Sequence, residues 1–387
     1  MATFTLSDVK SFVGRKLHGT SISKVEGFYT LAREAGANVL SKIRPKETQR
    51  INEVSLYDSI YEVSAPADFL NNGFVDVRPQ ANRSTKDNFN QYGSREFDYA
   101  KPEGGLNVEY DDANQTLRIK RSLTGNILIN DMDSLTANGT WAAEGGGSNA
   151  TVDATYFTQG SASINFDVAS TGGAIANSTM TQVDLANHDE ISSLFARVYI
   201  PDSSIVSSMN LRWGNDSGAY WERTVTAPHS GSFRNGWQWI RFDWNGATET
   251  GTVAPATIDY LRLLVTTTAS DTDIRVDEIR SVLPYIYELV YYSSALFRPA
   301  SGSTWLETPT ADTDIVNLGP DSFPILGYEM CYLLAQEIQG GDASFDASYF
   351  YKKLYGDGSN QNMGLYAEYQ AKHPSELLQQ KQVYYRV

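Results

Sequence analysis

The residues best suited to ligand chemistry in this chain are tryptophans spaced two positions apart. The stretch NGWQWIRFDWNG, residues 235–246, holds Trp237, Trp239 and Trp244. Aromatic side chains at alternate positions of a strand share one face, which serves either as a stacking surface for sugar rings or as the apolar inside of a sandwich. The candidate sugar-binding residues are Trp237, Trp239, Trp213 and Trp221.

Strand parity separates these two uses of tryptophan. If residues 237–244 form one strand, Ile240, Phe242 and Trp244 share a face that should point into a core. Trp237 and Trp239 then lie on the opposite face together with charged residues. We expect that face to be partly exposed, and Trp213 or Trp221 on neighbouring strands is a candidate to extend it. A sugar site and packing against a loop or a neighbouring protein both remain open.

Residues able to perform catalysis are sparse. The four histidines stand in no metal-binding or nucleophile motif, and the one cysteine, Cys331, lies in an apolar helical run where a buried, inert thiol is expected. Acidic pairs such as Asp271 and Asp273 cluster at predicted turns, where carboxylates are usually solvated. The sequence therefore predicts a protein that is not an enzyme and requires no cofactor.

Charge divides the chain into parts of different character. The net charge is −15 and the pI about 4.7, which argues against tight binding of nucleic acid through a basic surface. No lysine occurs between Lys120 and Lys352, and residues 127–283 hold 8 arginines against 18 acidic residues, a net of −10. Six of the seven tryptophans lie within this segment.

The lysine-free segment reads as a two-sheet sandwich or jelly roll. It is rich in Gly, Ser, Thr and Asn, and its short alternating runs are separated by turn residues, as in all-β domains. The predicted strands are SASINFDVAS, LFARVYIP, SMNLRWG, YWERTVT, WQWIRFDW, IDYLRLLVTT and DIRVDEI.

The flanking segments mix helices and strands. Helical spacing predicts helices over 7–17, capped by Ser7, and over 23–43, and further helical stretches follow residue 320. The sequence therefore predicts an α+β protein: a discontinuous helix-plus-β domain, residues 1–126 and 284–387, with an inserted all-β jelly-roll sandwich, residues 127–283. No run of about 18 apolar residues and no secretory signal are present, so we expect a cytosolically made chain with no membrane partner.

Several flanking motifs resemble a family of tailed-bacteriophage virion proteins. They include SLYDSIYEVSAPADF, FVDVRPQANRS and YDDANQTLRIKRSL before the insert, and YELVYYSSALFRPASGSTWLE and DSFPILGYEMCYLLAQEI after it. The pattern is similar to neck proteins, also called head–tail adaptors or connectors, over roughly residues 50–120 and 285–375.

The resemblance to adaptors implies a set of partners. The expected assembly is a homo-oligomeric ring, a dodecamer, between the portal protein and the next tail or neck protein, with double-stranded DNA passing through without sequence reading. The expected location is the neck or tail of a virion assembled in the host cytoplasm. Tyrosine-rich segments would supply subunit contacts; the candidate interface residues are Tyr285, Tyr287, Tyr291, Tyr292, Tyr384 and Tyr385. The tail KQVYYRV reads either as an arm for a neighbour or as a plain surface tail.

The insert resembles a carbohydrate-binding-module-like jelly roll. The resemblance rests on NDMDSL at its start, QGSASINFDV, the GW…IRFDW strand, and IRVDEI at its close. Such folds often carry a structural calcium, which implies Asp131, Asp133 and Asp277 as ligands, with carbonyls from the loop before Ser161. Solvated acids at strand ends are the competing interpretation.

Two functional classes follow. The leading interpretation is a structural head–tail adaptor whose jelly roll decorates the neck. The alternative is a carbohydrate-binding host-adsorption or tail/baseplate protein in which the sandwich binds a surface glycan.

Overall fold

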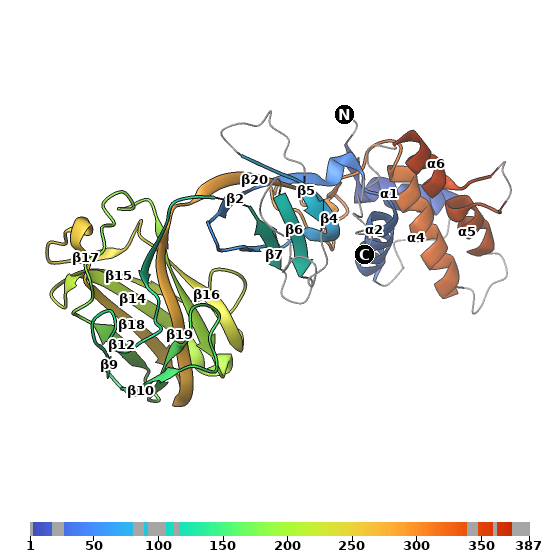
Figure 1. Ribbon diagram of the computed structural model, residues 1–387. Coiled ribbons are helices and arrows are strands. Elements are labelled where there is room, and N and C mark those ends of the chain that lie inside the picture. Colours follow the sequence, from blue (N-terminus) through green and yellow to red (C-terminus); the bar gives the residue numbers. More distant parts are fainter. Residues whose placement is uncertain are drawn as a thin grey trace, which may run out of the picture. The chain divides into compact units, whose positions relative to one another are not determined.

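The structure of the chain is a computed structural model that describes most of its residues (Figure 1). The described ranges are 3–17, 27–79, 89–91, 106–111, 116–121, 123–338, 347–358 and 362–373. Within these ranges, no helix has both the length and the apolar character needed to span a membrane. Two predicted interface residues, Tyr384 and Tyr385, lie outside the described residues.

The chain divides into two compact units. Unit 1 comprises residues 1–53, 66–78 and 288–387, and unit 2 comprises residues 54–65 and 79–287. The predicted insert lies wholly inside unit 2, while unit 1 is assembled from segments before and after it. Residues 79–126, which the sequence assigns to the N-terminal flank, group with unit 2. A helical unit and a β-sandwich thus occur in one chain, compatible with the predicted α+β class.

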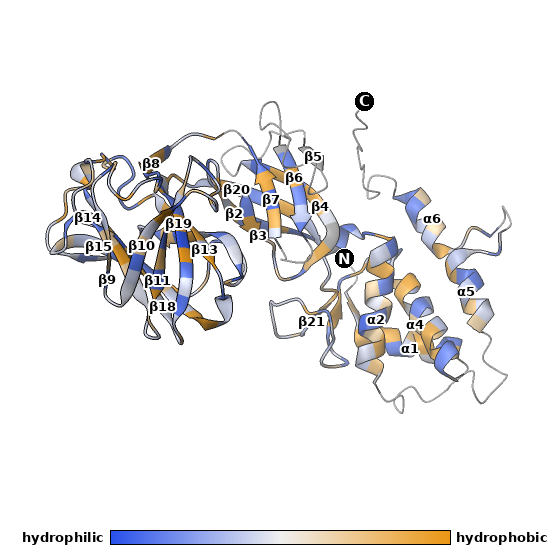
Figure 2. Ribbon diagram, turned by 60° about the horizontal axis from the view of Figure 1, so that its bottom comes forward, coloured by the Kyte–Doolittle hydropathy of each residue, from blue (hydrophilic) through white to orange (hydrophobic). Residues whose placement is uncertain are grey.

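Unit 1 contains every α-helix of the described residues. The helices are α1 (Leu6–Lys16), α2 (Phe28–Lys42), α4 (Phe323–Ile338), α5 (Ala347–Tyr355) and α6 (Leu365–Lys372). Their apolar faces form one core, visible as hydrophobic stripes on α1, α2 and α4 in Figure 2. Buried side chains of this core include Val9, Val13, Leu31, Val39, Leu326, Leu334 and Leu354.

The first helix begins earlier than the sequence predicts. Thr5 is its N-cap: the Thr5 hydroxyl accepts from the Asp8 backbone N–H at 3.3 Å, and the Asp8 carboxylate accepts from the Thr5 N–H at 2.8 Å. This reciprocal capping box satisfies two otherwise unpaired donors, so Ser7 is the second residue of the helix and not its cap.

Two three-stranded sheets include residues of unit 1. A three-stranded sheet has the order β1-β22-β21, with bounds Phe4–Thr5, Ile315–Val316 and Phe297–Arg298. A second has the order β2-β20-β4, with bounds Gln49–Leu56, Tyr285–Ser293 and Phe69–Pro79. Single 3-10 turns occur at Lys46–Thr48, Ser203–Ile205 and Pro255–Thr257.

Unit 2 contains a small sheet and the sandwich. The small sheet has the order β3-β7-β6-β5, with bounds Glu62–Ser64, Thr116–Lys120, Leu106–Asp111 and Phe89–Gln91. Its β5 and β6 pair in parallel, and the other pairs are antiparallel.

The sandwich consists of two six-stranded antiparallel sheets. The first, here called the β13 sheet, has the order β10-β11-β19-β13-β16, and β8 also pairs with β19. Its strands are Gly147–Asp153, Ser163–Val168, Asp271–Val282, Ser193–Ile200 and Gly236–Asp243, with β8 at Asn126–Asn130. The second, the β14 sheet, has the order β17-β15-β14-β18-β12-β9. Its strands are Thr248–Thr250, Ala219–Val225, Val206–Asp216, Tyr260–Thr267, Gly173–Asn177 and Trp141–Glu144.

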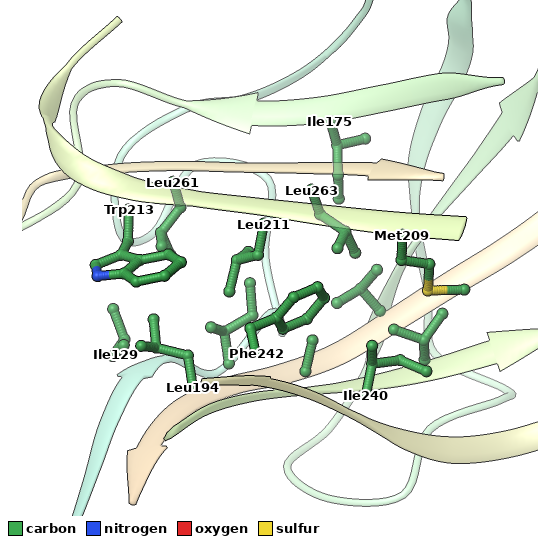
Figure 3. Close-up of a cluster of buried hydrophobic side chains, with 14 of the residues drawn as sticks. Ile129, Ile175, Leu194, Met209, Leu211, Trp213, Ile240, Phe242, Leu261 and Leu263 are labelled. Carbon is green, nitrogen blue, oxygen red and sulfur yellow. The ribbon is translucent and has the colours of Figure 1, made fainter. Parts of the chain in front are cut away.

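Alternate residues of both sheets fill the space between them. Met209, Leu211 and Trp213 of β14 meet Leu194, Ile240 and Phe242 of the opposite sheet, and all are fully buried (Figure 3). Because side chains on a strand alternate between faces, the residues between these core positions form the two outer faces of the sandwich. Any ligand surface on the sheets must be built from those outer residues.

Candidate functional site

Strand β16 follows the predicted parity. Ile240 and Phe242 are fully buried between the sheets, and Trp244 is 2% exposed. Trp237 and Trp239 point to the outer face of the β13 sheet, where Trp237 is partly exposed and Trp239 is 9% exposed. Of the three tryptophans in residues 235–246, Trp237 is the one whose indole is partly exposed to solvent.

Two of the predicted sugar-binding tryptophans are core residues. Trp213 is completely buried and Trp221 is 8% exposed. Both rings pack against Trp244, with centroids 5.5 and 5.0 Å apart. The expectation that they extend an outer aromatic surface is wrong, because they sit at positions of β14 and β15 that face between the sheets.

Trp239 is covered by the chain itself. Its ring lies in a cluster with Tyr57, Ile60, Phe195 and Val282. Tyr57 and Ile60 precede strand β3 and lie over the outer face of the β13 sheet, where they fill the area that a ligand would need. Packing, and not sugar stacking, accounts for Trp239.

Hydrogen bonds hold this covering segment in place. The backbone carbonyl of Glu62 accepts from His229 Nε2 at 2.7 Å, and the Glu62 carboxylate pairs with Arg234 at 3.0 Å. A carbonyl can only accept, so His229 carries its proton on Nε2. Burial lowers the pKa of His229 to about 4, and the nearby Arg241 charge acts in the same direction. His229 is therefore a neutral donor that fixes the segment near neutral pH.

The uncovered part of this face carries an aromatic row. In β13 and its neighbours, Tyr199 pairs with Trp237 on one side and with Arg275 on the other. Tyr156, from the loop after β10, adds a third ring that is 54% exposed. Ring centroids lie 5.5 Å apart for Trp237 and Tyr199, and 6.5 Å apart for Tyr199 and Tyr156. We call Trp237, Tyr199 and Tyr156 the aromatic row.

Arg275 stiffens the aromatic row. Its guanidinium lies 4.9 Å from the Tyr156 ring centroid and 5.1 Å from that of Tyr199. Its Nε donates to the Asp153 carboxylate at 2.8 Å, and its Nη1 donates to the Asp273 carbonyl at 2.8 Å. Stacking and hydrogen bonding together fix the planes of the neighbouring rings, which lowers the entropy lost when a ligand stacks on them.

Acidic and amide groups line one edge of the row. The hydrogen bond from Arg275 lowers the pKa of Asp153, so this carboxylate is ionised at neutral pH. Asp273 accepts from Asn165 at 2.9 Å, and its own N–H donates to Asp167 at 3.1 Å. The edge is rich in acceptor oxygens that hydroxyl groups can donate to.

The outer face of the β14 sheet has a different character. Tyr220 and Tyr260 lie there with centroids 6.3 Å apart, but they are only 9% and 4% exposed. Arg212 covers Tyr220, with its guanidinium 4.4 Å from the ring centroid, and pairs with Glu222 at 3.0 Å. This face presents paired charges, whereas the aromatic row presents open ring surface.

The three predicted calcium ligands separate into two groups. Asp133 accepts from the Ser161 and Ala162 N–H groups at 3.0 and 3.1 Å, and Asp277 accepts from Thr158 and Gln159 at 2.6 and 2.9 Å. These carboxylates hold the two ends of one loop. Asp131 is exposed and accepts only from the Asp133 N–H, at 3.4 Å, so the structure gives it no place in a shared site.

Two features of the loop between these carboxylates suit a bound cation. Asp277 is fully buried, and its Oδ1 has no hydrogen-bond partner. A side chain at Gly160, whose φ is +65°, would collide with the Asp133 carboxylate, so the loop closes tightly against that group. Asp277 and Asp133, with loop carbonyls, would hold a hard cation that neutralises the buried charge. No group of three His, Cys, Asp or Glu side chains able to hold a metal occurs among the described residues.

The predicted interface tyrosines are mostly buried within the chain. Tyr287, Tyr291 and Tyr292 are 5 to 6% exposed, and the Tyr291 hydroxyl donates to Asp68 at 2.8 Å. Tyr285 is partly exposed and its hydroxyl lies 2.8 Å from that of Thr124. The buried three support the fold of the chain, because little of their surface is left for a partner.

Two groups that could act as nucleophiles, Cys331 and His188, are enclosed. Cys331 is fully buried in α4, and burial raises the pKa of its thiol to about 12. His188 is 3% exposed and its Nδ1 lies 2.9 Å from the Ser281 hydroxyl, which is itself buried. These groups stabilise cores and offer no reactive surface.

Comparison with known proteins yields fold neighbours only. No protein-family model and no curated protein matches the chain. Among solved structures, the family 11 carbohydrate-binding module of the cellulase Lic26A-Cel5E of Clostridium thermocellum is 13% identical over 42% of this chain and 96% of its own, with a TM-score of 0.30. TmCBM61 in complex with β-1,4-galactotriose is 10% identical over 41% of this chain and 97% of its own, with a TM-score of 0.26. The carbohydrate esterase vb_24B_21 from the Shiga toxin-encoding bacteriophage phi24B is 15% identical over 42% and 99%, with a TM-score of 0.26. The neighbours include carbohydrate-binding-module-like β-sandwich domains, matching the jelly-roll part of this chain.

Proposed function

We propose that the sandwich of this protein binds a carbohydrate on the aromatic row of the β13 sheet. The observation that carries the proposal is the alignment of Trp237, Tyr199 and Tyr156 across one open sheet face, held by Arg275. Sugar rings present a face of C–H groups that stacks on aromatic rings, and a rim of hydroxyls that needs hydrogen-bond partners.

Both requirements are met on the same surface. The rings supply apolar area, and Tyr156 and the neighbouring Phe157 are 54% and 40% exposed. Asp153, Asp167 and Asp273 supply acceptor oxygens along the edge. A few polar groups around an aromatic surface are the usual composition of a small-molecule site.

Rigid strands place the groups before the ligand arrives. Trp237 and Tyr199 project from the paired strands β16 and β13, and Arg275 projects from β19 on the other side of β13. Such preorganisation improves affinity because fewer rotamers are frozen on binding.

The test is calorimetric titration of the intact chain with oligosaccharides selected on a glycan array. Trp237→Ala should weaken binding about tenfold or more, equivalent to about 1.4 kcal/mol or more, as expected for an exposed aromatic anchor. Tyr220→Ala, on the outer face of the β14 sheet, is the comparison variant and should change affinity by less than about twofold. The reverse pattern would place the ligand on the β14 sheet and refute the aromatic row.

A second proposal concerns the flanking segments. We propose that unit 1 mounts the sandwich on a tailed-phage virion, as a head–tail adaptor or a related neck or tail component. The support is the sequence resemblance of the flanks, together with the discontinuity of unit 1 around unit 2. Mass photometry of the chain, alone and mixed with a portal protein, tests it: a ring or a portal complex is expected, and a monomer that ignores the portal would refute it.

A further inference from the structure

We infer that the aromatic row selects neutral glycans and rejects anionic ones such as uronic-acid or sialic-acid polymers. This inference rests on the proposed function, because it specifies the ligand class of the same surface. It follows from the charged side chains around the row, some of which already bind partners within the chain.

The Arg275 cation beside the rings is already bound within the chain. Arg275 is 8% exposed, its guanidinium lies near the Tyr156 and Tyr199 rings, and it donates to the Asp153 carboxylate and the Asp273 carbonyl. Recognition of a carboxylate by arginine requires a free fork of two parallel N–H groups. Arg275 has no such fork to offer.

Three other arginines near this sheet face are paired with acids, whereas Arg197 has no acid partner among the described residues and lies over the covered Trp239 ring, 5.2 Å from its centroid. Arg234 pairs with Glu62 at 3.0 Å, Arg241 pairs with Asp243 at 2.6 Å, and Arg280 pairs with Glu278. No lysine lies between Lys120 and Lys352. The sandwich therefore lacks a mobile ammonium that could swing toward an anionic ligand.

Carboxylates gather beside the row, and that of Asp273 lies 3.6 Å from Nη2 of Arg275. Asp167 and Asp273 lie on adjacent strands β11 and β19, joined by the hydrogen bond from the Asp273 N–H. Asp202 and Asp271 are near them, and hydrogen bonds from Ser204 lower the pKa of Asp202. An anionic sugar stacked on the row would meet several carboxylates, whereas the unpaired Arg197 lies over the covered Trp239 ring, and like charges at short range oppose binding.

The same carboxylates favour a neutral ligand. A sugar hydroxyl is a donor as well as an acceptor, and an ionised carboxylate accepts from it through a charge-assisted hydrogen bond. The acids thus strengthen the binding of hydroxyl-rich neutral sugars and weaken the binding of anionic ones. This difference in affinity is the selectivity of the surface.

One substitution should change this selectivity and leave the fold intact. Asp273 has a φ of +65°, a left-handed conformation that asparagine adopts readily, and the amide oxygen of asparagine can still accept from Asn165. Asp273→Asn therefore removes one charge from the edge of the row with little strain. Asp216→Asn, which removes an exposed aspartate from the other sheet, is the matched control.

The experiment compares neutral polymers (β-glucan, mannan and galactan) with anionic ones (polygalacturonate, alginate and hyaluronan) by biolayer interferometry on the intact chain. At low salt, about 20 mM, the wild type should bind at least one neutral polymer at least about tenfold more tightly than any anionic one. Asp273→Asn should raise affinity for anionic polymers by about threefold to tenfold, with the gain shrinking at about 150 mM salt. It should also weaken neutral binding, because a charge-assisted hydrogen bond to a sugar hydroxyl becomes an ordinary one. Asp216→Asn should leave both unchanged.

The outcomes distinguish the inference from the proposed function. Binding of an anionic polymer as tightly as any neutral one overturns the inference alone, as does an Asp273→Asn variant with an unchanged preference. Binding of no polymer by the folded chain overturns the proposed function, and the inference falls with it.

Discussion

The two tryptophans of β16 that share a face should respond very differently to truncation. Trp239 is 9% exposed and packs against Phe195, with ring centroids 6.1 Å apart, as well as against Tyr57 and Ile60. The guanidinium groups of Arg197 and Arg280 lie 5.2 and 5.7 Å from its ring centroid. Removing such a ring should cost about 3 to 5 kcal/mol of unfolding free energy.

Trp237→Ala is the matched control, because it changes the same residue type on the same face of the same strand. The Trp237 ring is partly exposed and packs against the Tyr199 ring, so truncation should cost about 1 kcal/mol of unfolding free energy. The expected difference between the two variants is therefore about 2 to 4 kcal/mol.

Denaturant unfolding of the intact chain measures this difference. Six of the seven tryptophans lie between Trp141 and Trp244, so their fluorescence follows the sandwich, while circular dichroism at the helix band follows unit 1. The fluorescence midpoint should fall sharply for Trp239→Ala and slightly for Trp237→Ala, with the helix transition unchanged in both. Equal losses for the two variants would show that residues 57–60 do not cover Trp239 and would refute the reasoning.

Three further predictions address other parts of the molecule. Burial lowers the pKa of His229 from its ordinary value of about 6.5 to about 4 in the fold, so the unfolded chain binds more protons than the folded chain between these values. Sandwich stability should be complete above about pH 6.5 and fall by about 3 kcal/mol as pH drops to about 4, and His229→Gln should flatten this part of the profile. Calcium should raise the melting temperature of the sandwich, and Asp277→Asn should abolish that rise; an identical rise in the variant would exclude Asp277 as a ligand. In unit 1 the buried Glu329 accepts from Tyr366 at 2.8 Å and from Asn38 at 3.1 Å, so Glu329→Ala should cost about 2 to 4 kcal/mol in the helix transition, and an unchanged midpoint would contradict the burial of this network.

The alternating patterns of the sequence predict much of the fold. All seven runs that the sequence predicts as strands of the insert coincide with strands of the sandwich, because each alternates apolar and polar residues. Strands β9, β10 and β12 escape prediction: WAAE, GSNATVD and GAIAN are rich in small residues and lack a strong alternation of apolar and polar side chains, so their pairing depends on the strands beside them. Local pattern cannot report such dependence on neighbours.

The candidate site was only partly predictable. Parity places Trp237 and Trp239 on an outer face, and the same rule applied to NLRW of β14 would have put Trp213 inside. The alternation in FARVYI likewise marks Tyr199 as outward-facing. In contrast, Trp239 is not accessible to a ligand because Tyr57 packs against it. Tyr57 is far away in sequence, so only the folded structure reveals this contact.

The segments that flank the sandwich are assigned by sequence resemblance. The neck assignment rests on the motifs of the flanking segments alone, so it stays a prediction. Burial of Tyr287, Tyr291 and Tyr292 inside the chain removes one argument for a tyrosine-based subunit interface, since these side chains contribute to folding before any partner arrives.

The most direct test of carbohydrate binding is a crystal structure of the intact chain with the neutral oligosaccharide that it binds most tightly. We predict sugar rings stacked on Trp237 and Tyr199, with hydroxyls donating to the carboxylates beside them. A sugar seated instead on Tyr220 and Tyr260 of the β14 sheet, or absent from the sandwich at concentrations well above its dissociation constant, would contradict the assignment of the aromatic row.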